Sequence, residues 1–164
     1  WIMDSEPVSA VGTASQKVRA LGDCNDHFSV IFQYADGVDV SFTSRQFPAF
    51  GTNPDGIRNR MFGTKGVLET SYGGEVLIRG DKDSFYRGGS SPGIYQDGAV
   101  ANIATFHARI TARQFDNETV APSVRSNLVT ILGRTAAYEG RKVTWKELTE
   151  SKSALKWDLS GLKA

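Results

Sequence analysis

Arg45 and Gln46 are the residues best suited to bind a polar ligand, because they end the clearest strand pattern of the sequence and precede a loop over residues 47–56. Strand ends beside loops are places where a rigid scaffold presents binding groups. Neighbouring strand residues point to opposite faces of a sheet, so only one of the two side chains can face a given pocket unless a bulge intervenes. We expect Arg45 and Gln46 to bind substrate. The structural alternative is an ion pair at the rim for Arg45 and a solvated amide for Gln46.

Other residues offer weaker chemistry. Asp23 and His27 have the four-residue spacing that brings two side chains to one face of a helix, but they follow Gly22 in a stretch between strands, where no helix forms. We therefore predict no catalytic residue in this chain. The single cysteine, Cys24, and the two histidines, His27 and His107, have no spacing typical of a zinc site. We predict no metal site either.

Alternating apolar and polar residues predict the sheet that positions these groups. From Asp26 to Tyr34 the apolar residues other than Ile31 fall on one parity, and residues 38–43 repeat the pattern after an Asp36-Gly37 turn. This pair of segments predicts a hairpin. Further strands are expected at residues 7–15, 57–62, 67–72 and 76–78, which gives five or six strands, mostly antiparallel.

Beyond a predicted loop at residues 80–97, the apolar residues recur with the period of a helix. Residues 99–110 and 124–138 carry this pattern and predict two amphipathic helices. Pro122 and Gly140 suit the first turn and the end of the second helix, which we place at about Pro122 to Glu139. Thr144 and Glu147 have the spacing of a capping box and predict a short third helix, followed by an irregular tail at 151–164.

Strands first and helices afterwards are the order of an α+β domain. We predict one domain over residues 1–164, with an open, mostly antiparallel sheet of five or six strands and two or three helices on one face. The other face would carry polar or small side chains, which suit water or a wet subunit interface. These side chains belong to His27, Ser29, Gln33, Asp39, Ser41, Thr43 and Arg45.

Composition and charge exclude several classes of function. The chain has 164 residues, 40% of them hydrophobic, with 17 glycines and 5 prolines, as in an ordinary globular domain. The net charge of +1 gives no long-range field to attract a phosphate backbone, so we expect no nucleic-acid partner. No apolar run approaches the roughly 18 residues of a membrane helix, so we expect no membrane partner. A lone cysteine is ordinary in a cytosolic protein and does not by itself exclude an exported one; we expect a cytoplasmic location.

Several stretches taken together resemble one family. They are EPVSAVG (6–12), DHFSVIFQYADGV (26–38), SRQ (44–46), FGTKG (62–66) and SNLVTILGRTAAYEG (126–140), the last followed by VTW (143–145). This set resembles the C-terminal domain of the Gfo/Idh/MocA oxidoreductases, the family of glucose-fructose oxidoreductase and inositol dehydrogenase. The resemblance covers residues 1–148 and leaves 149–164 as a tail.

The resemblance implies a substrate-binding and oligomerisation domain of an NAD(P)-dependent sugar or polyol oxidoreductase. In such an enzyme an N-terminal Rossmann domain binds NAD or NADP, and the sheet domain shapes the pocket for the sugar or polyol and forms a homo-oligomer through its open face. No Gly-x-Gly-x-x-Gly follows a strand here, so we predict no cofactor-binding residue in this chain. The family's Glu-Lys-Pro motif is absent, and its catalytic Asp–His pair would lie immediately upstream of Trp1, which we expect to be a cut end.

Two other functions stay open. The same family contains NAD-dependent glycosidases, in which the oxidation labilises a glycosidic bond, and nothing in these residues separates the two reactions. A non-catalytic interaction module, whose sheet face forms a dimer and whose helices dock a partner protein, is the alternative from another class. In the oxidoreductase interpretation the isolated chain is inactive, and the chain extended upstream binds NAD(P)H.

Overall fold

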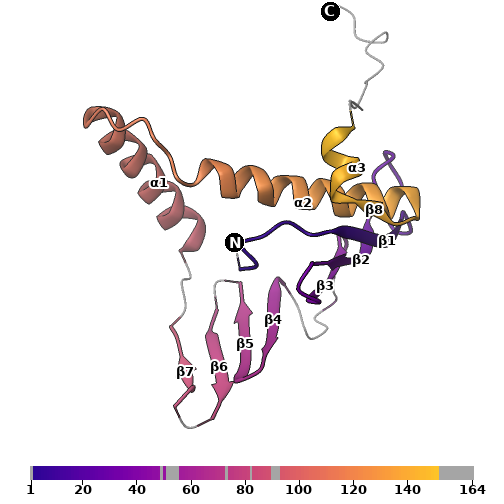
Figure 1. Ribbon diagram of the computed structural model, residues 1–164, viewed down its shortest axis with the longest axis horizontal. Helices are drawn as coiled ribbons and strands as arrows, with labels where there is room; N and C mark the ends of the chain where they lie inside the picture. Colours follow the sequence, from indigo (N-terminus) through magenta and orange to yellow (C-terminus); the bar gives the residue numbers. More distant parts are fainter. Residues whose placement is uncertain are drawn as a thin grey trace, which may run out of the picture. The chain divides into compact units, whose positions relative to one another are not determined.

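The computed structural model describes residues 2–48, 50, 56–72, 74–81, 83–89 and 93–151. The chain divides into two compact units, one formed by Trp1–Phe47 with Asn117–Ala164 and the other by Pro48–Asp116. Each unit contains one four-stranded antiparallel sheet, and the described residues form three helices (Figure 1). The predicted α+β class is confirmed.

The sheet of the first unit has the strand order β3-β2-β1-β8. Its strands are β1 (Ser9–Ser15), β2 (His27–Gln33), β3 (Asp39–Arg45) and β8 (Val143–Thr144). The predicted hairpin joins β2 to β3, and Gly37 in its turn has φ of 79°, a left-handed conformation that glycine adopts without strain. The loop between the paired residues Tyr34 and Val38 has three residues, and the left-handed Gly37 at its end sets the register of the two strands.

Two helices belong to the same unit, α2 (Val120–Glu139) and α3 (Trp145–Glu150). Helix α2 begins two residues before Pro122 and ends where predicted, at a left-handed Gly140 whose N–H donates to the Ala136 carbonyl. Helix α3 confirms the prediction from the capping box: the Thr144 hydroxyl accepts a hydrogen bond from the Glu147 N–H at 3.1 Å.

The hydrophobic core lies between α2 and one face of this sheet. Its buried members are Ala10, Val30, Phe32, Leu132, Ala136, Ala137 and Val143. Gly133 lets the helix approach the sheet, because a Cβ at this position would lie only 2.5 Å from Cζ of Phe32. The alternation of β2 thus places Val30 and Phe32 beneath the helix and turns the intervening residues away from it.

The opposite face of this sheet, here called the open face, carries the residues predicted for it. Register places Ser15, His27 and Arg45 in one cross-strand row, and Thr13, Ser29 and Thr43 in the next row. Gln33, Asp39 and Ser41 share the same parity. Two apolar side chains, Val11 and Ile31, also lie on the open face and are 40% and 42% exposed.

The second unit contains a sheet of order β4-β5-β6-β7 and one helix. Its elements are β4 (Arg58–Gly63), β5 (Gly66–Ser71), β6 (Val76–Gly80), β7 (Tyr86–Arg87) and α1 (Ile94–Thr111). Helix α1 begins before the predicted helical pattern, and β7 lies inside the predicted loop because it pairs with β6. None of the residues of α1 is buried.

Six strands have five residues or more, as predicted, but they do not form one sheet. Among the described residues β3 pairs with β2 and β4 pairs with β5, so the hydrogen-bonded order breaks between β3 and β4. Most of the predicted irregular tail, residues 152–164, lies outside the described residues, as do residues 51–55 of the loop after Gln46. No helix in the described part of the chain is both long and apolar enough to cross a membrane.

Candidate functional site

The two predicted substrate residues diverge at the end of β3. Arg45 lies on the open face, opposite His27 of β2. Gln46 follows the strand: its N–H donates to the Asp26 carbonyl at 2.7 Å, and its side-chain amide lies 3.4 Å from the hydroxyl of Ser44. Ser44 has the parity of the core face, so the sheet brings Arg45 and Gln46 to opposite sides, as the alternation rule requires.

A hydrogen-bonded row that the sequence analysis missed lies beside Arg45. Ser15 Oγ is 2.9 Å from His27 Nε2, and His27 Nδ1 is 3.1 Å from Asp26 Oδ1. The side chain of His27 is 39% exposed, whereas Asp26 is fully buried. The sequence signal was the pair Asp26-His27 at the start of a strand, but the partner Ser15 is twelve residues away and is fixed only by register.

Asp26 is held by the backbone of the loop after β1. Its carboxylate accepts hydrogen bonds from the N–H groups of Lys17, Val18 and Arg19, at 2.6 to 3.1 Å. These hydrogen bonds, led by the one from Arg19, outweigh the desolvation caused by burial and hold the pKa of Asp26 well below its usual range. The group is an anion in a fixed orientation.

Asp23 and His27 do not lie together on a helix. His27 Nδ1 contacts Asp26, not Asp23, and Asp23 lies in a bend before β2 rather than on a helix. Cys24 is exposed, and its thiol lies 3.8 Å from a carboxylate oxygen of Asp23. In the part of the chain that the structure describes, no group of three or more potential ligands is arranged to hold a metal ion.

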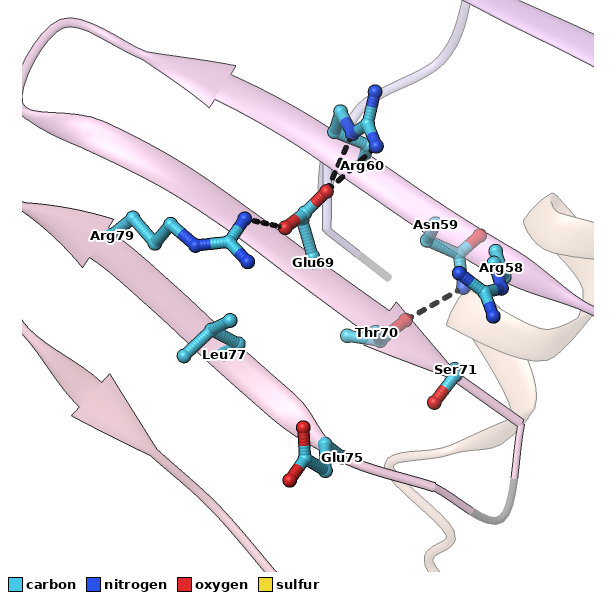
Figure 2. A pocket seen from close by; sticks show the side chains of 9 residues that line it. All are labelled: Arg58, Asn59, Arg60, Glu69, Thr70, Ser71, Glu75, Leu77 and Arg79. Atoms are coloured by element: carbon cyan, nitrogen blue, oxygen red, sulfur yellow. Dashed lines mark hydrogen bonds and ion pairs between the residues drawn. The ribbon is translucent and has the colours of Figure 1, made fainter. Parts of the chain in front are cut away.

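A second candidate site is a hollow of about 620 Å³ on the sheet of the second unit, shown in Figure 2. Charged and hydroxyl side chains from β4, β5 and β6 dominate its lining: Arg58, Asn59, Arg60, Glu69, Thr70, Ser71, Glu75, Leu77 and Arg79. Three guanidinium groups against two carboxylates leave the lining with one excess positive charge. Such a surface suits an anionic or hydroxyl-rich ligand.

Glu69 organises this hollow. It accepts a hydrogen bond from Arg60 Nε at 2.7 Å and forms an ion pair with Arg79, so one carboxylate bridges three adjacent strands (Figure 2). The hydrogen bond from Arg60 is the main reason why the pKa of Glu69 lies below its ordinary value. Beside it, the Asn59 amide donates to the Thr70 hydroxyl at 3.1 Å. The bridge depends on the register of β4 against β5 and of β5 against β6, which no local sequence pattern specifies.

No protein-family profile and no curated protein matches the sequence. The fold, however, is similar to parts of solved structures. A proposed oxidoreductase from Thermotoga maritima is 18% identical with a TM-score of 0.63, and the similarity covers 88% of this chain and 42% of that one. A proposed oxidoreductase from Klebsiella pneumoniae is 15% identical with a TM-score of 0.53, covering 88% of this chain and 46% of that one.

A third solved structure is an oxidoreductase from Agrobacterium radiobacter in complex with NAD+, L-tartaric acid and magnesium. It is 15% identical with a TM-score of 0.65, and the similarity covers 85% of this chain and 43% of that one. This chain therefore spans less than half the length of each of the three proteins. Its fold is one that occurs within oxidoreductase chains about twice as long.

Proposed function

We propose that this chain is the substrate-binding and oligomerisation domain of an NAD(P)-dependent sugar or polyol oxidoreductase of the Gfo/Idh/MocA type. The observation that carries the proposal is the similarity of 85% of the chain to 43% of an oxidoreductase that binds NAD+. The sequence stretches that resemble this family, from residues 6–12 to residues 143–145, also support the proposal. Because a fold alone does not define an activity, the proposed reaction has to be tested by experiments on the site itself.

The residues of this chain do not fit a dinucleotide. No Gly-x-Gly-x-x-Gly turn is present in the sequence, and the glycines between β7 and α1, which are Gly88, Gly89 and Gly93, do not have that spacing. We therefore assign binding of NAD or NADP, and the hydride transfer, to a Rossmann domain outside this chain. The proposed role of this chain is to bind and orient the secondary alcohol that is oxidised.

Arg45 and Gln46 are the proposed substrate residues. The Arg45 guanidinium has several N–H donors in a fixed geometry, which suits hydroxyl and carboxylate oxygens of a sugar, sugar acid or polyol. The Gln46 amide both donates and accepts, which suits a hydroxyl group. Since the sheet sends the two side chains to opposite faces, we expect Arg45 to contribute more to the binding of any single ligand than Gln46 does.

The test extends the chain upstream in its own gene and compares the extended protein with residues 1–164. We expect the extended protein to bind NADH or NADPH, seen as energy transfer from tryptophan to the nicotinamide, and to reduce the oxidised cofactor in the presence of a sugar or polyol from a panel. The shorter chain should do neither. An extended protein that binds neither cofactor would contradict the proposal.

The same experiment separates the two alternatives. NAD+-dependent release of nitrophenol from nitrophenyl glycosides, without net reduction of NAD+, would indicate the glycosidase. A protein that lacks both activities but still binds a partner protein would be the interaction module. The exposed apolar side chains of α1, with Ile103 at 69% and Phe106 at 65%, are the feature that favours a partner surface.

A further inference from the structure

Ser15, His27 and Asp26 have the connectivity of a nucleophile, a base and an orienting acid. Ser15 Oγ lies 2.9 Å from His27 Nε2, within the range in which a base removes a proton from a hydroxyl group. Asp26 Oδ1 lies 3.1 Å from the other ring nitrogen, Nδ1. The three groups come from the end of β1 and the start of β2, within one unit of the chain.

The environment of Asp26 determines where the proton on the ring of neutral His27 lies. The pKa of Asp26 is depressed, and its carboxylate accepts three backbone N–H groups, so it is ionised and can only accept a further hydrogen bond. The Nδ1 atom must therefore carry the hydrogen. In the neutral ring Nε2 is then the acceptor, and it accepts the hydroxyl hydrogen of Ser15. This is the direction of proton transfer found in serine hydrolases.

The row is also reachable from solvent. His27 is 39% exposed at its side chain, and the row ends on the open face, in register with Arg45 of the neighbouring strand. In a serine hydrolase the aspartate is likewise buried behind a histidine that the substrate can reach. The guanidinium of Arg45 adds a positive charge at the next position of the row.

We propose that Ser15 is an activated nucleophile that accepts acyl groups from small carboxylic esters, with His27 as its base. The Ser15 oxygen attacks the ester carbonyl carbon, and its proton moves to His27 Nε2. The bond from carbon to the alkoxide leaving group then breaks, and His27 returns the proton to that group. Water attacks the acyl-serine in the same way and releases the carboxylic acid, so no further reactant is needed. The site uses no nicotinamide. It lies on the open face, which the proposed homo-oligomer would cover, so we expect the acylation of the dissociated chain.

The test treats the purified chain, diluted until sedimentation shows a monomer, with a fluorophosphonate probe and, separately, with p-nitrophenyl acetate. We expect one adduct per chain, located at Ser15 by peptide mapping, and nitrophenol release faster than the background hydrolysis. Ser15→Ala should abolish the adduct. His27→Gln should slow labelling by about 100-fold or more, the scale of a positioned general base.

Ser29→Ala is the matched control, because Ser29 lies on the same open face but is in register with Thr13 and Thr43 instead of a histidine. It should label at the rate of the unmodified chain. Thermal unfolding of each variant checks that the fold is kept. The unmodified chain alone can overturn the proposal: no adduct, or an adduct at another residue, excludes an activated Ser15. Equal labelling of His27→Gln would likewise show that the row serves only to join β1 to β2.

Discussion

Asp26 combines complete burial with a full set of hydrogen-bond donors. A carboxylate in this position joins the loop after β1 to the start of β2. Since each of its partners is a donor, a neutral amide cannot replace it without placing an NH2 group against backbone N–H groups. The loop therefore depends on the charge of Asp26, and its stability depends on pH.

We expect Asp26→Asn to lower the midpoint of urea unfolding at pH 7. The pKa of Asp26 is lower in the folded state than the value of about 3.9 in an unfolded chain, so the ionised carboxylate stabilises the fold fully above that pH. This stabilisation is lost as the pH falls below about 4 toward the folded-state pKa. The difference between the two midpoints should therefore shrink from pH 7 to pH 3. A difference that is the same at both pH values would contradict this account of Asp26.

Arg45→Ala tests substrate binding in the protein extended by its upstream domain. If Arg45 contacts the substrate, the variant should lose about 1.5–3 kcal/mol of binding, the usual scale for a hydrogen bond to a charged group. That loss corresponds to a rise in KM of roughly 10- to 150-fold. Gln46→Ala should have a smaller effect on the same ligand. Unchanged kinetic parameters for Arg45→Ala would leave it with the ion-pair role at the rim.

At the level of elements, α2 and α1 differ in what they contact, although both are amphipathic in sequence. Helix α2 buries Leu132 and Ala136 against β1 and β2, whereas α1 has no buried residue. The same substitution should therefore have opposite effects in the two helices. Glycine to alanine favours a helix by about 1 kcal/mol when nothing else changes.

Gly98→Ala and Gly133→Ala are that matched pair. A Cβ at position 98 meets nothing within 4 Å, so we expect Gly98→Ala to increase the helical signal of α1 in circular dichroism. A Cβ at position 133 would lie 2.5 Å from the ring of Phe32, so Gly133→Ala should destabilise the first unit by about 1–3 kcal/mol despite its helix propensity. Urea unfolding measures the second effect. If Gly133→Ala instead increased the stability of the first unit, α2 would be able to move away from β2 at little cost.

At the level of the whole molecule, we propose association through the open face of the first sheet. Val11 and Ile31 are adjacent across β1 and β2 on this face and are surrounded by serine and threonine. In a two-fold interface each residue occurs twice, so one added charge brings two like charges together.

Ile31→Lys should therefore raise the dissociation constant for self-association by at least about 10-fold, as measured by sedimentation. Val18→Lys, which changes an exposed apolar residue in the loop after β1, is the control and should leave association unchanged. If Ile31→Lys still associates as strongly as the unmodified chain, the interface does not lie on the open face. A strictly monomeric unmodified chain at high concentration would contradict the proposal as a whole.

The features that depend on near neighbours could be predicted from the sequence. Alternation predicted β2, β3 and the parity of the open face, and turn residues predicted the hairpin connections among five or six strands. The capping box predicted α3. These predictions succeeded because strand alternation, turn conformation and helix capping depend on residues a few positions apart. The placement of Arg45 on the open face was predictable for the same reason.

Which residues meet across strands follows from the folded arrangement of the strands. It brought Ser15 to His27, and it set Glu69 between Arg60 and Arg79. It also divided the predicted single sheet into two. Cross-strand pairs depend on register and on the closure of the intervening loops, and a shift of one residue would move every side chain to the other face. Periodicity indicates which face a side chain takes, but not which residue of the neighbouring strand it meets.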